Sequence, residues 1–379
     1  MPEQDPSERT SSYGDKQISG TVTFFDPVDS SIVPLKGVTV IIRDATRIAS
    51  SLSDSLGNFF ISSPQIVSDT VEVLLKFDND YLEIHTLDLA NLSAVFGTNI
   101  YSLGFKRSCA FTDMKIEIGR QFNNAALHHS CAALHALNEY KNFASHNGFL
   151  MPDKKFLFWL GREAPISVSY ATPMLRNMAQ QNIGNPQQLL TNLFGVPSSL
   201  ASTLAFIIKD QLPDLYAPFY NRYSTAARAS FIETMFHELS HASHYAKVGP
   251  AFWLPYVEYI YGNGGYGEPS LANSGIISLS EAWAEDLSNI GLNYTYHQQK
   301  YLDLNENTDP FWIPYGLYHD LYDSGTNESF DNTAAIGFKQ VYDLFSADTK
   351  SLELLKAKLK TNFPAQQAGI DTLFQHYGY

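Results

Sequence analysis

Two histidines and a glutamate lie close together near the middle of the 379-residue chain, in the segment His237-Glu238-Leu239-Ser240-His241. Residues 227–247 contain neither proline nor glycine, and Phe231 and Met235 are among the apolar residues before the histidines, so the pattern predicts one continuous helix. At ~3.6 residues per turn, His237 and His241 lie one turn apart on the same face. Imidazoles at this separation are suited to share one zinc ion.

Glu238 adds the second part of the chemistry. A bound zinc ion lowers the pKa of its water toward ~7, and a neighbouring carboxylate then accepts the proton. The pattern therefore predicts hydrolysis by Glu238-assisted attack of zinc-bound water. A Glu238→Gln substitution is expected to keep the metal and abolish most turnover. The alternative interpretation is a surface helix whose histidines and glutamate face solvent; the rarity of this spacing and its helical context favour the metal site.

A catalytic zinc ion also needs a third protein ligand, with the fourth position left open. His244 continues the same helical stripe, but it lies ~10.5 Å along the axis from His237. One metal held between His237 and His241 therefore cannot also reach His244. We expect His244 to be packed or to form part of the cleft wall. The extended metzincin pattern requires glycine at position 244 and histidine or aspartate at 247. This chain has His244 and Lys247, so that family is excluded.

A second predicted helix follows around Ser280–Asp286, where Glu281 and Glu285 share one face between apolar residues. Together with the first motif, this segment resembles the gluzincin class of zinc metallopeptidases, which includes the thermolysin-like enzymes. The resemblance implies that Glu281 is the third zinc ligand and that Glu285 orients a zinc-binding histidine. It also implies a peptide or protein substrate. The gap from His241 to Glu281 is longer than in thermolysin, and Glu285 stands where that enzyme has aspartate.

Two alternatives remain for this second segment. Glu285 rather than Glu281 would be the ligand in an inverted assignment, and both carboxylates would merely face solvent if the segment were a helix edge.

Other functions are also compatible with the motif. Non-peptide amide hydrolysis would use the same residues. A rival of another class is a catalytically inactive surface or adhesion protein that uses the peptidase fold as a scaffold. The intact Glu238 argues against this rival, because nothing structural requires a glutamate there.

The tyrosine- and glycine-rich segment Tyr256–Gly275 separates the two motifs, and we expect a mobile loop over the cleft. Its Gly262–Gly267 stretch formally matches a dinucleotide pattern, but no suitably capped helix follows it. Peptide hydrolysis also needs a donor to the developing oxyanion. The candidates are Tyr256, Tyr259 and Tyr261, or the aromatic cluster at 312–320.

The first third of the chain has a different character. Short β-rich runs alternate with turn signals between residues 17 and 119, which predicts a small β-sandwich. The predicted strands are Ile18–Phe25, Val38–Arg43, Phe59–Ser62, Val71–Phe77 and Tyr81–Leu87. Gly20-Thr-Val-Thr, Pro34–Val40 and Ser53–Phe60 resemble the transthyretin-like regulatory domains appended to carboxypeptidases and to bacterial surface proteins. In that family Asp54 to Phe59 would form a turn entering a strand, with Gly57 at its tight position.

Residues 120–379 are predicted to form a mixed, mainly helical metallopeptidase domain of the zincin type, so the whole chain is expected to be α+β. The predicted helices include Phe122–Phe143, Gln187–Phe194 and Leu200–Asp210. The predicted strands are Phe156–Leu160, Ile166–Tyr170 and Leu215–Tyr220.

Charge and composition exclude several classes of protein. A formal net charge of −14 gives no positive field for nucleic acid or for anionic membranes. No run of about 18 apolar residues is present, so we expect no transmembrane segment. Residues 1–16 are polar, and we expect them to form a flexible leader. This expectation favours a secreted or lipid-anchored protein whose signal has been removed over a cytoplasmic one. Cys109 and Cys131, the only cysteines, are interpreted as two buried thiols rather than a disulfide.

Overall fold

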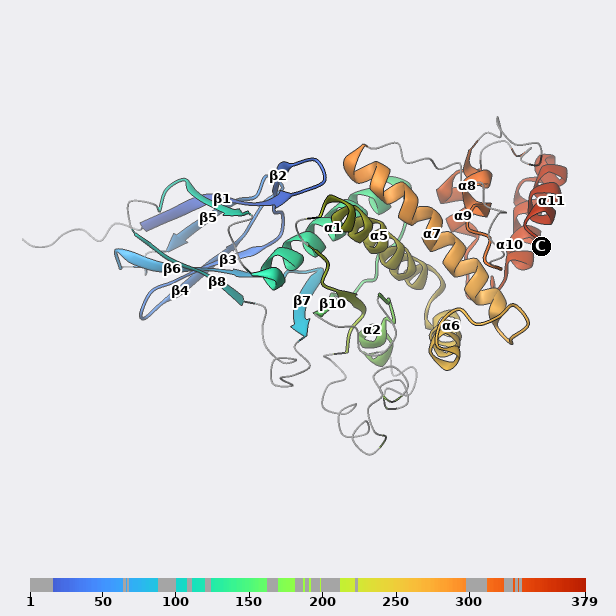
Figure 1. Cartoon of the computed structure of the whole chain (residues 1–379), viewed down its shortest axis with the longest axis horizontal. Coiled ribbons are helices and arrows are strands. Elements are labelled where there is room, and N and C mark those ends of the chain that lie inside the picture. Colours follow the sequence, from blue (N-terminus) through green and yellow to red (C-terminus); the bar gives the residue numbers. More distant parts are fainter. Residues whose placement is uncertain are drawn as a thin grey trace, which may run out of the picture. The chain divides into compact units, whose positions relative to one another are not determined.

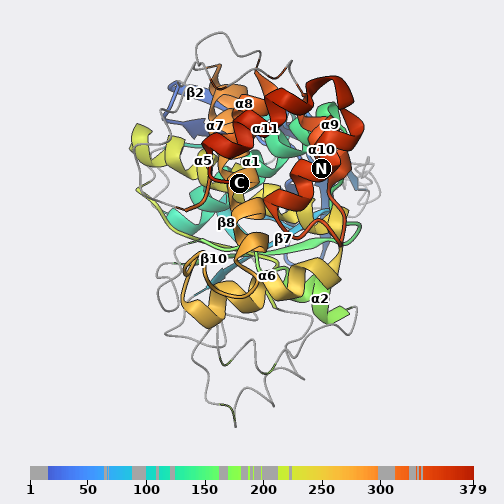
Figure 2. The same ribbon diagram turned by 90° about the vertical axis from the view of Figure 1, so that its right-hand side faces the viewer.

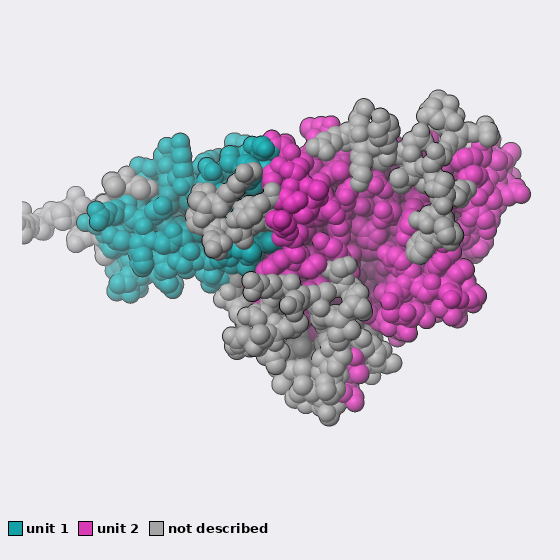
Figure 3. All heavy atoms as spheres, in the orientation of Figure 1, with its two compact units in different colours: residues 1–26, 30–79, 98–134 teal, residues 27–29, 80–97, 135–379 magenta. Residues whose placement is uncertain are grey.

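The computed structural model describes residues 16–63, 68–87, 100–107, 111–119, 124–161, 170–180, 212–221, 224–297, 312–323 and 336–379, with 66, 187, 191, 198, 330 and 333. Both helices and sheets are present, which confirms the α+β class. The chain divides into two compact units, residues 1–26, 30–79 and 98–134, and residues 27–29, 80–97 and 135–379 (Figure 3). The predicted boundary near residue 119 stays a prediction.

The first unit contains two four-stranded sheets (Figure 1). In one, β1 (Lys16–Asp26) pairs antiparallel with β2 (Ser31–Pro34) and β5 (Asn58–Ser63), and parallel with β9 (Met114–Ile118). In the other, the antiparallel order is β4 (Ile48–Leu52), β3 (Thr39–Arg43), β6 (Thr70–Lys76) and β8 (Ile100–Arg107). Alternate residues are buried along β3 and β9, as expected for strands with one face in a core.

The predicted turn before β5 is confirmed. The Asp54 carboxylate accepts hydrogen bonds from the backbone N–H groups of Leu56 and Asn58, both at 2.8 Å. Gly57 has a φ of 75°, a conformation that glycine adopts without the steric cost of a Cβ atom.

One predicted strand has unexpected partners. The segment expected at Tyr81–Leu87 is β7 (Leu82–Leu87), but it pairs parallel with β10 (Phe156–Gly161), which pairs parallel with β11 (Leu215–Pro218). This three-stranded sheet belongs to the second unit. Local hydrophobic pattern predicts that a strand forms, but it does not select the sheet that the strand joins.

The second unit is mainly helical. Its site helices are α5 (Thr225–Val248), α6 (Pro250–Asn263) and α7 (Ser274–Tyr296). The other helices whose residues the structure describes are α2 (Leu175–Gln180), α8 (Leu317–Tyr322), α9 (Phe338–Leu344), α10 (Leu352–Asn362), a 3₁₀ turn at Pro364–Gln366 and α11 (Gln367–His376). Helices α8 to α11 gather together in both views (Figures 1 and 2). Helix α1 (Ala125–Asn147), predicted from Phe122, is shared between the units.

Helix α5 forms the predicted element almost residue for residue. The Ser224 side chain caps its N-terminus by accepting a 3.2 Å hydrogen bond from the N–H of Ala227. Helix α7 packs along α5, and a glycine permits the close approach: a Cβ atom at Gly291 would lie 2.2 Å from Cγ of Phe236. Phe236 directly precedes the first histidine of the motif. The contact between Gly291 and Phe236 therefore sets the distance between α5 and α7 close to the motif.

The loop predicted at Tyr256–Gly275 was wrong in its first part, because Tyr256 to Asn263 are helical in α6. The loop was predicted from the glycines at 262–267, most of which lie beyond the helix, and α6 continues through Pro255 although proline is usually unfavourable inside a helix. The turn that follows begins at Gly264.

Several sequence predictions lie wholly or largely outside the described residues. They are the strand at 166–170, the helices at 187–194 and 200–210, the leader and Cys109. Cys131 is a buried free thiol. No helix in the part of the chain that the structure describes is long and apolar enough to cross a membrane.

Candidate metal centre and active site

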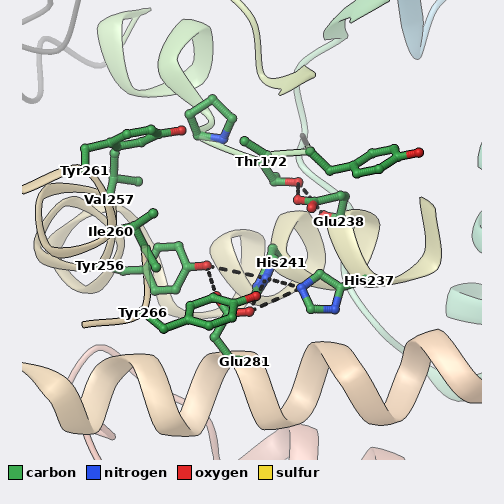
Figure 4. A pocket seen from close by; sticks show the side chains of 13 residues that line it. Thr172, His237, Glu238, His241, Tyr256, Val257, Ile260, Tyr261, Tyr266 and Glu281 are labelled. Carbon is green, nitrogen blue, oxygen red and sulfur yellow. Dashed lines mark hydrogen bonds and ion pairs between the residues drawn. The ribbon is translucent and has the colours of Figure 1, made fainter. Parts of the chain in front are cut away.

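Three side chains from two helices point at one another in the second unit (Figure 4). His237 and His241 lie one turn apart on α5, and their Nε2 atoms are 3.1 Å apart. Glu281, on α7, places Oε2 3.2 Å from Nε2 of His237 and 3.5 Å from Nε2 of His241. The structure thus brings together the three residues that the sequence assigned as metal ligands.

The triangle formed by these three atoms fits a zinc ion. Ligand atoms that lie ~2.0–2.1 Å from a tetrahedral zinc are about 3.3 Å from one another. The observed edges of 3.1, 3.2 and 3.5 Å agree with this value. Glu281 Oε2 is buried and accepts no hydrogen bond from any described residue. An oxygen in that state is what a metal ligand without its metal would show.

Charge pairing between the two helices is strong. Burial raises the pKa of the Glu281 carboxyl, but the charges of His241 and His237 outweigh this effect and hold that pKa below its usual range. Burial lowers the pKa of the His237 imidazole, whereas the Glu281 and Glu285 carboxylates beside it raise that pKa well above its usual value. Glu281 therefore stays a carboxylate, the form that binds a metal.

Glu285 lies one helical turn beyond Glu281 and contacts the other side of His237. Its Oε2 is 3.3 Å from Nδ1 of His237, and its side chain is 37% exposed. Nδ1 is the atom through which an outer carboxylate orients a metal-binding imidazole. Glu281, and not Glu285, has an oxygen close to the Nε2 atoms of both histidines. The geometry therefore favours the original assignment of these two carboxylates over the inverted one.

Glu238 is buried beside the ligands. Its Oε2 accepts a 2.7 Å hydrogen bond from the Thr172 hydroxyl, which is also 2.7 Å from the backbone carbonyl of Glu238. Two backbone hydrogen bonds between Ala171 and Tyr216 tie the neighbouring residue to β11. Burial raises the pKa of the Glu238 carboxyl. This carboxylate is held by a neutral donor and is favourably placed for proton transfer.

His244 is packed, which confirms that prediction. It is fully buried, and its ring contacts Phe252 and Phe345 with centroid separations of 4.8 Å in both cases. Burial lowers the pKa of His244 to about 3. Its Nδ1 lies 3.3 Å from the Ser280 hydroxyl. The third histidine of α5 is thus a neutral core residue.

Two cavities share His237, Glu238, Tyr170 and Tyr266. The smaller, about 70 Å³, is lined by these residues and by Ala171, Thr172, Pro173, His241, Tyr256, Val257, Ile260, Tyr261 and Glu281. The larger, about 340 Å³, is polar and is also lined by Ser230, Glu233, Thr234, Glu285, Ser288 and Asn289. The walls beside Glu238 thus change from mainly aromatic and aliphatic residues in the smaller cavity to polar ones in the larger.

The tyrosines predicted as candidate oxyanion donors differ in whether they line a cavity. Tyr256 and Tyr261 line the smaller cavity, whereas the Tyr259 hydroxyl donates to the carbonyl of Glu268. None of the described residues at 312–320 lines either cavity. Tyr266, which the sequence did not single out, also hydrogen-bonds Glu281.

Thr172 was missed altogether. It lies 66 residues before Glu238, and nothing in the sequence around it signals the contact.

Comparison with known proteins finds no relative: no family model, no curated protein and no solved structure matches this chain.

Proposed function

We propose that the chain is a zinc-dependent metallopeptidase of the gluzincin type, with His237, His241 and Glu281 as zinc ligands. One observation carries this proposal: Oε2 of Glu281 and the two Nε2 atoms form a triangle with edges of 3.1 to 3.5 Å, next to a buried glutamate. The donor set of two imidazoles and one carboxylate is that of a catalytic zinc site with an open fourth position.

The remaining residues have distinct roles in the proposed reaction. When bound, zinc would supply Lewis-acid polarisation of the peptide carbonyl and acidify a water molecule. Glu238 accepts a proton from the attacking water and returns it to the leaving amine nitrogen. Thr172 holds one oxygen of Glu238, and Glu285 orients His237. Water adds across the peptide bond, so the products are a carboxylate and an amine.

The proposal also covers the first unit, as a transthyretin-like β-sandwich of regulatory type. Its two sheets, the alternating burial of their strands and the Asp54–Gly57 turn support this assignment. Within the described residues, the only His, Cys, Asp and Glu group suited to a metal is the one in the second unit. The proposal therefore assigns the metal site to the second unit alone.

The test compares the wild-type chain with Glu238→Gln. Metal content is measured by mass spectrometry, and hydrolysis of a mixed peptide library is followed by product identification. We expect one zinc per chain in both proteins and cleavage by the wild type alone. A chelator should abolish cleavage, and added zinc should restore it.

Other outcomes would overturn the proposal. Bound zinc without cleavage of any peptide would favour the non-enzymatic scaffold. Equal cleavage by Glu238→Gln would remove Glu238 from the mechanism. The absence of zinc from a folded wild-type chain, even after incubation with the metal, would remove the metal centre itself.

A further inference from the structure

The two oxygens of the Glu281 carboxylate have different partners. Oε1 accepts a hydrogen bond from the hydroxyl of Tyr256. Oε2 faces the Nε2 atoms of His237 and His241, and no described residue donates a hydrogen bond to it. A phenol is protonated at neutral pH and is a good donor. One oxygen is therefore engaged by the protein, and the other is left for a metal.

Tyr256 is held firmly in the place that produces this division. It lies on α6, and its side chain is buried. Its ring stacks on that of Trp253 with a centroid separation of 4.4 Å, and it contacts the His241 ring at 5.4 Å. Its hydroxyl lies 3.4 Å from Nε2 of His241. The hydroxyl is thus fixed at the edge of the ligand triangle, rather than reaching it from a mobile side chain.

We propose that Tyr256 is a positioning residue that makes Glu281 a single-oxygen metal ligand and so keeps one coordination position open. The inference rests on the proposed zinc site and adds a determinant that the motif does not contain. A carboxylate is able to bind a metal through one oxygen or through both. If Oε1 also bound, it would crowd the position that a catalytic site leaves for water or substrate, and it would raise the coordination number from four, three protein ligands and one water, to five.

Two other tyrosines provide controls. Tyr259 lies on the same helix and is also buried, but its hydroxyl donates to the backbone of Glu268. Tyr259→Phe therefore removes a buried hydroxyl from α6 without touching the ligands. Tyr266 hydrogen-bonds Glu281 from the turn after α6, so Tyr266→Phe tests whether the second nearby hydroxyl is the important one.

The experiment uses the full-length chain with Tyr256→Phe, Tyr259→Phe and Tyr266→Phe. Phenylalanine keeps the ring, so the stack on Trp253 is retained. Each protein is loaded with cobalt(II), whose visible absorption weakens as coordination rises above four, and with zinc for X-ray absorption. Zinc affinity is measured by competition with a chromophoric chelator. These readouts do not depend on activity.

We expect Tyr256→Phe to weaken the cobalt absorption, to raise the zinc coordination number and to lower zinc affinity by roughly 10- to 100-fold, the usual effect of removing a group that orients a ligand. Tyr259→Phe should match the wild type. Unchanged spectra and affinity in Tyr256→Phe would overturn the inference. So would a spectral change confined to Tyr266→Phe.

The proposed function and this inference fail in different ways. A wild-type chain that binds zinc but cleaves no peptide contradicts the peptidase, while the Tyr256 spectra still decide the inference. A wild-type chain that binds neither metal overturns both. Cleavage by a wild type whose spectra equal those of Tyr256→Phe overturns the inference alone.

Discussion

Helices α5 and α7 each bring one buried glutamate to the same cavity, yet the two carboxylates differ in character. Glu238, on α5, is hydrogen-bonded by the neutral hydroxyl of Thr172, and burial raises its pKa. Glu281, on α7, lies between two imidazoles, whose charges lower its pKa. The charges of His237 and His241 lower the pKa of both carboxyls, but burial outweighs them at Glu238 and not at Glu281. This is the difference that the proposed roles of proton acceptor and metal ligand require.

The largest expected effect comes from the ligand side of this comparison. Glu281→Ala removes the carboxylate that completes the triangle, so zinc affinity should fall by more than about 100-fold, beyond the usual loss for groups that only orient ligands. Zinc content after dialysis and chelator competition measure the loss. Retention of stoichiometric zinc at wild-type affinity would show that Glu281 is not a ligand.

On the proton-transfer side, the corresponding change is Thr172→Val, which keeps the shape of the side chain and removes the hydroxyl that holds Glu238. We expect kcat to fall by roughly 100-fold, as for a misplaced catalytic group, with zinc content and KM unchanged. Thr172→Ser, which keeps a hydroxyl, should recover most of the rate. A loss of zinc in Thr172→Val would mean that the two sides of the site are not separable.

Glu285 provides a finer test, because it contacts a ligand without joining the triangle. Glu285→Ala should lower zinc affinity by roughly 10- to 100-fold, less than the loss in Glu281→Ala, since His237 loses the partner of its Nδ1. Glu233→Gln, in the wall of the same cavity, is the matched control and should leave affinity unchanged. An effect of Glu285→Ala equal to that of Glu281→Ala would support the inverted ligand assignment.

The last prediction concerns folding stability rather than zinc affinity or rate, at His244, which is buried without the carboxylate that His237 has. Its folded-state pKa of about 3 lies below the unfolded value of ~6.5, so the unfolded chain binds the extra proton first as pH falls. In urea unfolding of the metal-free proteins, the wild type should lose stability relative to His244→Gln between pH 6.5 and 3, by up to about 1.4 kcal/mol per pH unit. A stability difference independent of pH would contradict this account.

The sequence predicts those parts of the site that are local along one helix. His237, Glu238 and His241 are recognisable because four residues make one helical turn, and the N-terminal strands follow from alternation. The partner of Glu238 depends on tertiary contacts. Thr172 reaches it from a segment paired with β11, and no local pattern encodes that pairing. Glu281 was found only because a family resemblance supplied the expectation.

Other differences have the same origin. The strand at 82–87 was predicted, but its pairing with β10 depends on residues more than 60 positions away. Tyr256 was assigned to a loop because of the glycines that follow it, whereas packing of Trp253 and its neighbours stabilises α6. In α6, burial of the side chains outweighed the low helix propensity of proline and glycine.

Gly291 gives the site a dependence that no list of its ligands would reveal. Its missing side chain lets α7 approach Phe236, the residue next to His237, so the gap between the helices is a dimension of the metal centre. Gly291 contains no donor atom, yet the spacing of the proposed ligands depends on it. In the proposed zinc site, a methyl group at Gly291 would widen the span between the two helices that the ion has to bridge.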